Sequence, residues 1–294
     1  MYEPNRTAGA RYAAVAVGVP VLAAAAASLA TRRQPLARFA LVAAATWTVL
    51  GGRSLRREAT GLADALAERD LATARRRLPS LAGRDASTLD EAGLARAAVE
   101  SVAENTADAV VGPLFWGAVA GLPGLVGYRA VNTLDAMVGH RSPRYAEFGT
   151  AAARADDVAN LVPSRLTAAL FVAGAPLVGG RISRSGWTWL RDGHRHPSPN
   201  AGQCEAAMAG ALGVRLGGVN VYSGRTEIRP ALGEGPLPDS DDIGRAVKLS
   251  TAAGAAALVL ATVRTLTGPW LRPRWLRRRR ASNPGQAPLR DGRD

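Results

Sequence analysis

The stretch AVESVAENTADAVVGPLFW, residues 98–116, places three carboxylates directly ahead of a long uncharged segment. Glu100, Glu104 and Asp108 follow one another at intervals of four residues, so a helix would carry them on one face. Like charges at this spacing destabilise a helix by about 0.2–0.5 kcal/mol per pair. An acidic face at the edge of an apolar segment therefore needs a compensating charge. Arg96, one helical turn before Glu100, is the simplest candidate for an ion pair, and a bound cation is the alternative.

Uncharged, apolar blocks recur along the chain and indicate a membrane protein. Two of them reach the roughly 20 residues that a transmembrane helix needs, and the shorter ones become long enough when flanking basic side chains extend to the interface. The alternatives are buried helices of a soluble protein and, for the first block, a signal peptide. A second apolar block follows the first within a few residues, which favours a membrane hairpin. The predicted apolar segments are 12–31, 39–52, 109–128, 166–182 and 249–267.

The segments between these blocks predict further helices. Residues 54–78 alternate apolar and charged positions with helical spacing, which is typical of an amphipathic helix. A second helix is predicted to follow, with Thr88 and Glu91 as its capping box. No alternating strand of useful length is present. The sequence therefore predicts an all-α, polytopic integral membrane protein with four or five apolar helices, some of them re-entrant, in one membrane-embedded domain over 1–280.

The net charge of +13 comes almost wholly from arginine. The sequence RPRWLRRRR, residues 272–280, follows the last apolar block. Such a cluster could bind nucleic acid, but beside an apolar helix it is more typical of a cytoplasmic helix end that contacts anionic lipid. We therefore expect membrane lipid and no nucleic acid as a partner. Residues 281–294, rich in Pro, Gly and charge, predict a disordered basic tail.

Three polar clusters lie at the edges of the apolar blocks. They are NTLDAMVGHR at 132–141, ARADDVANLVPSR at 153–165 and HPSPNAGQCEAAMAGALGVRLGG at 196–218. Each has a structural explanation when taken alone, either as a solvated helix face paired with arginine or as a helix start with Asn200 as its N-cap. Ionisable residues are costly to place at a membrane edge, however, and their joint occurrence indicates a functional site.

Cysteine and histidine predict little chemistry. The single cysteine, Cys204, excludes a disulfide within the chain and a Cys-based zinc site. His194 and His196 form an H-x-H pair that could bind a metal. Histidines in a loop with Pro and Gly are more often solvated, which is the interpretation we favour here.

Five segments occur together and in order: LRREATGLADALAERDLATAR, RAAVESVAENTADAVVGPLFWG, VNTLDAMVGHR, FGTAAARADDVANLVPSRL and SPNAGQCEAAMAGALGVRLGGVNVY. In them the chain resembles the adenosylcobinamide-phosphate synthase family of cobalamin biosynthesis (CobD/CbiB), over about residues 53–248. The resemblance implies a multi-pass protein of the cell membrane that consumes ATP and joins aminopropanol, or its phosphate, to one propionate of adenosylcobyric acid through an amide bond. Its active site is expected on the cytoplasmic side, and other membrane proteins of the pathway are candidate partners.

One departure concerns the N-terminal region. Members of this family usually begin with a further hydrophobic segment that carries a Gly-Asp-Pro…His-Pro motif, whereas this chain starts at MYEPNRTAGARYAAVAVG. Its start thus corresponds to the middle of the family's N-terminal region. If that motif helps to build the site, the chain is expected to be inactive as written.

Amide formation needs an activated carboxylate, because a carboxylate in water is a poor electrophile. ATP would convert it to an acyl phosphate that the amine attacks, and such a site needs Mg²⁺ on oxygen ligands, cations for phosphate and a general base. No G-x-x-x-x-G-K-[ST] motif is present, so arginine side chains are expected to hold phosphate. We expect the metal on Asp156 and Asp157, acid–base or second-metal roles for Glu100, Glu104, Asp108 and Asp135, and substrate contacts from Asn105, Asn132, Arg154, Asn160, Arg165, Ser198 and Asn200.

These residues can form one site only if the block 109–128 does not cross the bilayer. Pro and Gly recur in it, so we expect it to be broken or re-entrant, which is permitted where backbone is buried in protein or lines a cavity. Two other classes stay open. A Mg²⁺-dependent membrane transferase of diphosphate substrates also uses Asp-rich helices, although its second motif would be DSDD at 239–242, in a Pro- and Gly-rich loop. The other class is a non-catalytic membrane scaffold or a corrinoid-transport component.

Overall fold

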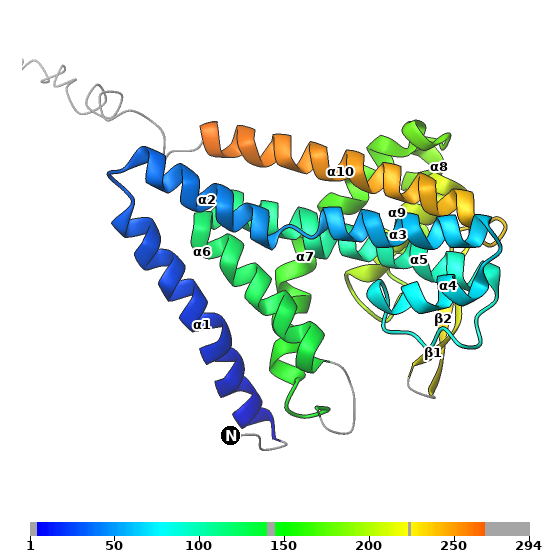
Figure 1. Cartoon of the computed structure of the whole chain (residues 1–294), viewed down its shortest axis with the longest axis horizontal. Helices are drawn as coiled ribbons and strands as arrows, with labels where there is room; N and C mark the ends of the chain where they lie inside the picture. The colour runs from blue at the N-terminus through cyan, green and yellow to red at the C-terminus, as the bar shows by residue number, and fades with distance from the viewer. Residues whose placement is uncertain (1–4, 140–144, 223–224, 268–294) are drawn as a thin grey trace, which may run out of the picture.

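The chain folds into an assembly of helices with one β-hairpin (Figure 1). The structure, a computed structural model, describes residues 5–139, 145–222 and 225–267. Five helical segments are long and apolar enough to cross a membrane, which confirms the expected all-α, multi-pass class. These segments are Arg6–Ala30, Pro35–Ala67, Glu91–Gly139, Thr150–Val178 and Ser240–Thr267.

The elements follow one another with short connections. They are α1 (Arg6–Ala30), α2 (Pro35–Val49), α3 (Gly52–Ala67), α4 (Leu71–Arg77), η1 (Leu78–Ser80), α5 (Glu91–Thr106), η2 (Ala107–Val111), α6 (Gly112–Leu134), η3 (Asp135–Gly139), α7 (Thr150–Gly174), η4 (Ala175–Val178), α8 (Ile182–Asp192), α9 (Ala201–Leu212), β1 (Leu216–Tyr222), β2 (Arg225–Leu232) and α10 (Ser240–Thr267). Among them, η2 and η3 are π-helical turns.

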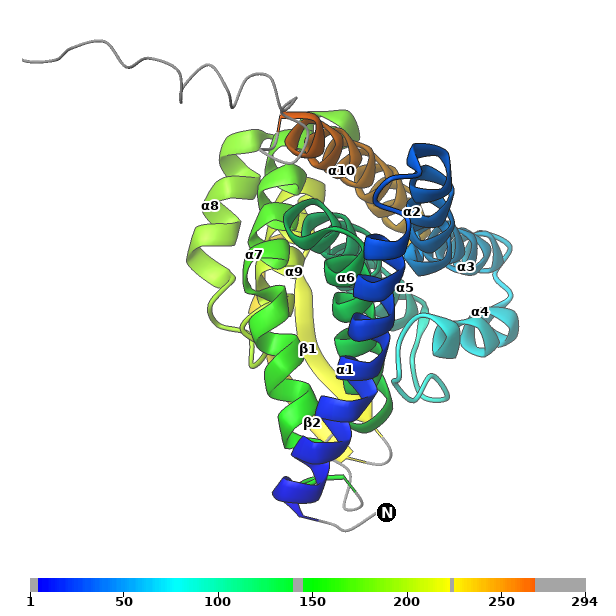
Figure 2. The same ribbon diagram turned by 90° about the vertical axis from the view of Figure 1, so that its left-hand side faces the viewer.

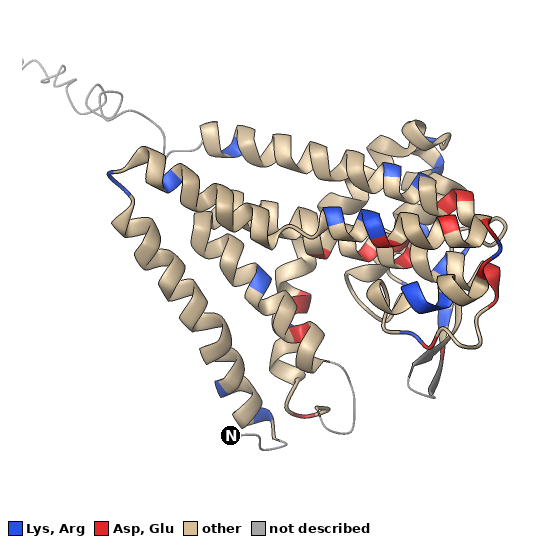
Figure 3. Cartoon of the chain, in the orientation of Figure 1, with Lys and Arg blue, Asp and Glu red and all other residues tan. Residues whose placement is uncertain are grey.

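Charged side chains are unevenly distributed over the fold. They gather around α3, α4, α5 and the β-hairpin, whereas α1, α2 and the C-terminal half of α10 carry few (Figure 3). Large apolar side chains on these three helices are exposed in the isolated chain, among them Leu22, Trp47 and Leu260. Extended apolar surface of this kind indicates contact with the hydrocarbon of a bilayer.

The main core lies between α3, α5, α9 and α10. Every residue of α9 except Gln203 is buried, and α5 is buried continuously from Leu94 to Ala103. Alanine and glycine dominate both helices, so their backbones approach their neighbours closely. A Cβ on Gly210 of α9 would lie 2.7 Å from the Cα of Ser185 in α8. A second part of the fold consists of α1, α6 and α7, which lie side by side (Figure 2).

Helix α6 reverses its direction at Gly121. This glycine has φ 67° and ψ −151°, a backbone conformation that is essentially restricted to glycine. The two arms on either side of it pack against each other, because a side chain on Gly112 would collide with the ring of Tyr128. From Asp108, the last charged residue before the turn, to Gly121 the helix rises by about 20 Å at 1.5 Å per residue, less than a hydrocarbon core of about 30 Å. The expected break in this block is therefore confirmed, and the reversal returns residues 132–135 toward the end from which the segment started.

Two predicted helix boundaries are wrong. Asp90 caps α5 by accepting a hydrogen bond from the Gly93 amide at 2.8 Å, so Thr88 does not form the expected capping box. Aspartate is among the strongest N-cap residues and lies closer to the first turn. The amphipathic segment 54–78 is two helices, α3 and α4, separated at Arg69, which has a positive φ of 58°.

The hairpin of β1 and β2 was not predicted. Its strands pair antiparallel, with an irregularity between Leu216 and Gly218. Gly217 and Gly218 both have positive φ angles, 84° and 93°. The bulge at the start of β1 interrupts the alternation of apolar and polar residues, which is the pattern from which a strand is predicted.

Two further sequence predictions concern residues near the C-terminus and His140. The motif DSDD at 239–242 is not wholly in a loop, because α10 begins at Ser240. His140, the basic cluster 272–280 and the tail 281–294 lie outside the described residues.

The reversal of α6 predicts that residues 88 and 146 lie on the same side of the membrane. Thr88→Cys and Ala146→Cys, both at exposed positions, are expected to react with a membrane-impermeant maleimide from one and the same side of sealed, oriented vesicles. The chain without either substitution is the background control, because its single cysteine, Cys204, is 1% exposed. Labelling from opposite sides would show that α6 crosses the bilayer.

Candidate functional site

Carboxylates from distant parts of the sequence line one small pocket, which we call the acidic pocket. Its volume is about 30 Å³, and Glu104 at its edge is exposed. Such a volume accommodates one or two water molecules or a single cation, and it excludes a nucleotide or a corrin ring. The lining residues are Glu104, Ala107, Asp108, Asp156, Asp157, Asn160, Ser164, Ser198, Asn200, Ala201 and Cys204.

Three elements position these side chains. The end of α5 and the turn η2 supply Glu104 and Asp108, α7 supplies Asp156 and Asp157, and the start of α9 closes the third side. The turn η2 is π-helical, a local irregularity that is frequent at functional sites. Asp108 is repelled by its carboxylate neighbours, Glu104 first and Asp156 next. A cation in the pocket would offset this repulsion.

Asp156 is held by two amide side chains. Asn160 donates from Nδ2 to Oδ2 of Asp156 at 3.0 Å, and Asn132 donates from Nδ2 to Oδ1 at 3.3 Å. The hydroxyl of Tyr128 donates to Oδ1 of Asn160 at 2.7 Å, which orients the Asn160 amide with its nitrogen toward Asp156. Each Asp156 oxygen retains a further lone pair, so the carboxylate can still accept from, or coordinate, a ligand.

The segment before α9 is attached to α7 through side-chain hydrogen bonds. Asn200 donates from Nδ2 to the carbonyl of Asp157 at 2.8 Å, and its Oδ1 accepts from Arg165 at 3.2 Å. Arg165 also donates to the carbonyl of Pro199 at 3.2 Å. Ser198 Oγ accepts from the amides of residues 200 and 201 at 3.3 and 3.2 Å. Asn200 thus occupies the N-cap position of α9 as expected, but its side chain makes no capping hydrogen bond, and Ser198 Oγ accepts from the first amides instead.

Six expected site residues do not line the acidic pocket; Asn132 and Arg165 contact its lining, and the other four lie elsewhere. Asn105 donates to the carbonyl of Ser101 on its own helix at 2.9 Å. Arg154 is exposed on α7, and Asp135 is half-buried in η3. Glu100 is buried in a separate network. The lining thus unites seven of the predicted side chains, with Asn132 and Arg165 in contact with them: Glu104, Asp108, Asp156, Asp157, Asn160, Ser198 and Asn200.

The acidic pocket is not a complete metal cage. Among the residues that the structure describes, no group of three or more histidine, cysteine, aspartate or glutamate side chains is positioned to hold a metal ion. An ion bound here would need additional oxygen ligands from water or from a substrate.

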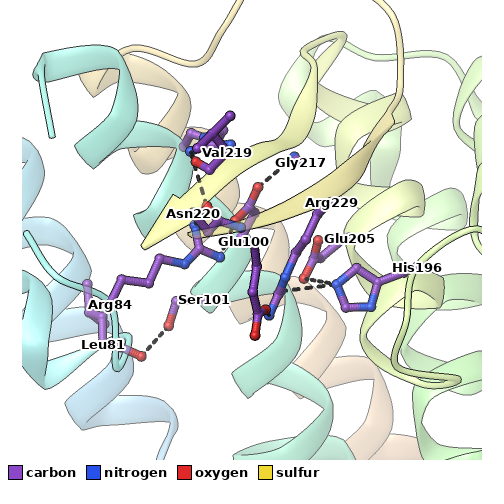
Figure 4. A network of polar contacts seen from close by, with 12 residues as sticks. Leu81, Arg84, Glu100, Ser101, His196, Glu205, Gly217, Val219, Asn220 and Arg229 are labelled. Atoms are coloured by element: carbon purple, nitrogen blue, oxygen red, sulfur yellow. Dashed lines mark hydrogen bonds and ion pairs between the residues drawn. The ribbon is translucent and has the colours of Figure 1, made fainter. Parts of the chain in front are cut away.

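Glu100 belongs to a buried network that attaches the β-hairpin to α5 (Figure 4). Its carboxylate forms an ion pair with Arg84 and accepts from the Gly217 amide at 2.7 Å. Arg84 and Arg96 each donate to Oδ1 of Asn220 at 3.1 Å. The compensating charge for Glu100 in this network is thus Arg84, and Arg96 contacts the hairpin. A general base or a metal ligand must be accessible to substrate or to the ion. Glu100 is only 1% exposed, so it does not fill the role that we expected.

His196, Arg229 and Glu205 extend this network toward the acidic pocket (Figure 4). The Ser198 amide donates to Nδ1 of His196 at 3.0 Å, and Nε2 of the ring lies 3.1 Å from the guanidinium group of Arg229. Burial, with the positive charge of Arg229, lowers the pKa of His196 to about 4. Burial, with the nearby carboxylate of Glu100, raises the pKa of Glu205 well above its ordinary value. Nε2 of His196 lies 3.9 Å from a carboxyl oxygen of Glu205, and this buried His196 is not the solvated histidine that we expected.

Some residues of these assemblies were not predicted. Glu205 could have been recognised from the sequence, because it is the only charged residue in the helix Ala201–Leu212. Arg229 lies in the strand that sequence analysis missed. Ser164 and Cys204 line the pocket as small, uncharged residues, and no pattern in the sequence distinguishes them from packing residues.

Comparison with known proteins identifies relatives along most of the chain. The family model described as CobD/Cbib protein matches residues 2–250. Cobalamin biosynthesis protein CobD of Mycobacterium tuberculosis is 53% identical over 263 residues, which cover 89% of this chain and 83% of the relative. The protein of the same name from Geobacter metallireducens is 45% identical over 264 residues, which cover 89% of this chain and 83% of the relative. The one from Rhodobacter capsulatus is 46% identical over 222 residues, which cover 75% of this chain and 69% of the relative. No solved structure matches the chain.

The different environments of two neighbouring carboxylates predict different mutant phenotypes. Glu100→Gln is expected to lower the free energy of unfolding by about 3–5 kcal/mol, because it leaves the buried Arg84 without its counter-charge. Glu104→Gln, one turn later and exposed, is expected to change it by less than about 1 kcal/mol. Denaturant unfolding of both purified variants, followed by tryptophan fluorescence, measures the difference. Equal losses would contradict a structural role confined to Glu100.

The lowered pKa of His196 predicts a loss of stability in acid. An unfolded chain protonates this histidine near pH 6.5, whereas the folded chain does so only near pH 4. Its contribution is therefore complete above about pH 6.5 and is lost as the pH falls toward 4, by at most about 1.4 kcal/mol per pH unit. Unfolding free energies measured across this range should fall less steeply for His196→Asn than for the unsubstituted chain. His194→Asn removes an exposed histidine of the same loop and is the matched control. An unchanged slope in His196→Asn would contradict the assignment.

Proposed function

Because the chain belongs to the CobD/CbiB family of cobalamin biosynthesis, we propose that it joins aminopropanol, or its phosphate, to a propionate of adenosylcobyric acid at the expense of ATP. The product is adenosylcobinamide or its phosphate. The observation that carries the proposal is an open pocket lined by four carboxylates at the edge of apolar helices. We place the protein in the cell membrane, with this pocket open to the cytoplasm, where ATP is present.

The proposed reaction has two steps. An oxygen of the propionate attacks the γ-phosphorus of ATP, and ADP leaves. The amine then attacks the acyl carbon, the phosphate leaves as inorganic phosphate, and the amine loses a proton as the amide forms. Glu104 is the proposed proton acceptor, because it is exposed at the edge of the pocket and can reach a substrate bound outside it.

The size of the acidic pocket limits what it can bind. At about 30 Å³ it accepts the ammonium group of aminopropanol or one metal ion, so the corrin ring and the nucleotide must bind outside it. A small pocket with four carboxylates selects its occupant by positive charge. Arg154, exposed on α7 two residues before Asp156, is our candidate for a phosphate contact outside the pocket.

The donor set of the acidic pocket fits Mg²⁺. Magnesium prefers oxygen ligands and is commonly held by one or two carboxylates, several waters and substrate phosphates, so a complete protein cage is not required. Asp156 and Asp157 are the proposed ligands, and Asp156 retains free lone pairs beside its two amide donors. The ion would neutralise charge on the phosphates of ATP.

The rival classes receive less support. A transferase of diphosphate substrates needs a second Asp-rich motif near the first, and residues 239–242 do not line the acidic pocket. A non-catalytic scaffold has no need of exposed carboxylates that repel one another. Activity of the purified chain separates the scaffold from the ligase.

The test is a reconstituted assay. The purified full-length chain in lipid nanodiscs receives ATP, Mg²⁺, adenosylcobyric acid and either aminopropanol or its phosphate, and the amide product is measured by mass spectrometry. Glu104→Gln and Asp156→Asn are expected to lower kcat about 100-fold or more, the usual contribution of a positioned base or charge. Asp241→Asn, an exposed aspartate of the other Asp-rich motif, is expected to retain the full rate.

Each outcome decides between the classes. Full activity of both pocket variants would remove the acidic pocket from the reaction. Loss of activity in Asp241→Asn would show that the second Asp-rich motif also contributes to amide formation. A folded, membrane-inserted chain that forms no amide with either amine would favour the scaffold.

A further inference from the structure

A second and larger cavity lies on the other side of η2 from the acidic pocket. Its volume is about 160 Å³, and it is lined by α3, α5, η2 and α10. Apolar side chains form most of its walls, and an arginine and two hydroxyl groups are its polar part. The lining residues are Gly52, Leu55, Arg56, Val102, Val110, Val247, Ser250, Thr251 and Gly254.

This cavity lies where two helical segments change from charged to apolar. The apolar helix α2 leads into α3, which begins with the arginine-rich sequence GRSLRRE. On α10, Lys248 is followed by an uncharged run that continues to Arg264. Basic side chains at the end of an apolar helix are typical of the membrane–water interface. The cavity is therefore at the level of lipid headgroups.

The exposed surface beyond the cavity is apolar. On α2 the side chain of Trp47 is 82% exposed, and on α10 the side chains of Leu258 and Val259 are 50% and 61% exposed. An apolar chain that leaves the cavity along these helices would remain in contact with lipid-facing side chains. The site thus combines a basic, hydroxyl-bearing mouth with an apolar wall that continues into the bilayer.

We propose that this cavity binds one anionic phospholipid. Its phosphate lies on Arg56, and the first part of an acyl chain lies between Leu55, Val110 and Val247. A cavity of about 150 Å³ holds an apolar group the size of benzene, which matches the first carbons of an acyl chain. Arginine suits the phosphate because its guanidinium group donates two parallel hydrogen bonds.

The small residues in the wall support this assignment. A Cβ on Gly254 would lie 3.1 Å from Cγ1 of Val110, and a Cβ on Gly52 would lie 3.1 Å from Cγ2 of the same valine. Larger side chains at either position would fill the space. The amide of Gly51 donates to the carbonyl of Ala109 in η2 at 2.9 Å, which fixes the junction of α2 and α3 at the edge of the cavity.

Native mass spectrometry of the delipidated full-length chain tests the proposal. Dioleoylphosphatidylglycerol is expected to bind about tenfold more tightly than dioleoylphosphatidylcholine, as for one charge-assisted hydrogen bond. Arg56→Gln is expected to abolish this preference. Gly254→Leu is expected to weaken binding of both lipids, because it fills the apolar part of the cavity. Arg57→Gln removes a neighbouring arginine that pairs with Glu58 and does not line the cavity, and is expected to retain the preference.

Several results would overturn the proposal. Equal affinity for the two lipids would exclude a phosphate site with headgroup selectivity. Competition by millimolar inorganic phosphate as effective as that by the anionic lipid would identify a site for free phosphate instead. An equal loss of preference in Arg57→Gln would show a diffuse attraction of the basic surface, and normal binding to Gly254→Leu would place the lipid outside the cavity.

Discussion

The backbone angles at Gly121 are the constraint on which the arrangement of polar groups depends. Because glycine alone adopts them readily, α6 can fold back on itself over a length shorter than the hydrocarbon core of a bilayer. Without this reversal, α5 and the start of α7 would be separated by a full membrane crossing. With it, Glu104 and Asp108 face Asp156 across one small pocket. Tyr128 on the returning arm then orients the amide that holds Asp156.

The mutual repulsion of the three carboxylates at four-residue spacing is reduced in two different ways. Glu100 is withdrawn from solvent and offset by Arg84 and a backbone amide of the hairpin. Glu104 and Asp108 stay at a pocket that a cation can enter. One helical segment thus carries a buried, paired acid and two acids that line a pocket, one turn apart. Burial and local partners, rather than sequence spacing, distinguish them.

Much of the fold and of the pocket was predictable from local sequence. Hydrophobic block length gave the membrane class, and the density of Gly and Pro in 109–128 indicated the break in α6. Charge at block edges identified most of the pocket lining. Long-range pairing was not predictable in the same way: Arg84 and Asn220 are 136 residues apart, and the strand that carries Asn220 begins with a glycine bulge that hides its alternation. Glu100 was therefore grouped with the pocket by its spacing, although its partners lie elsewhere.

The sequence distance between α5 and the β-hairpin has a consequence for biogenesis. The amide that Glu100 accepts from belongs to Gly217, which is translated 117 residues later. At about 5–20 residues per second, this corresponds to a delay of roughly 6–23 s during which Glu100 lacks that partner. The α6 segment reaches the insertion machinery before its acidic neighbours have all their contacts. Until the hairpin is complete, Glu100 has Arg84 as its counter-charge but lacks the backbone amide that completes its hydrogen bonding.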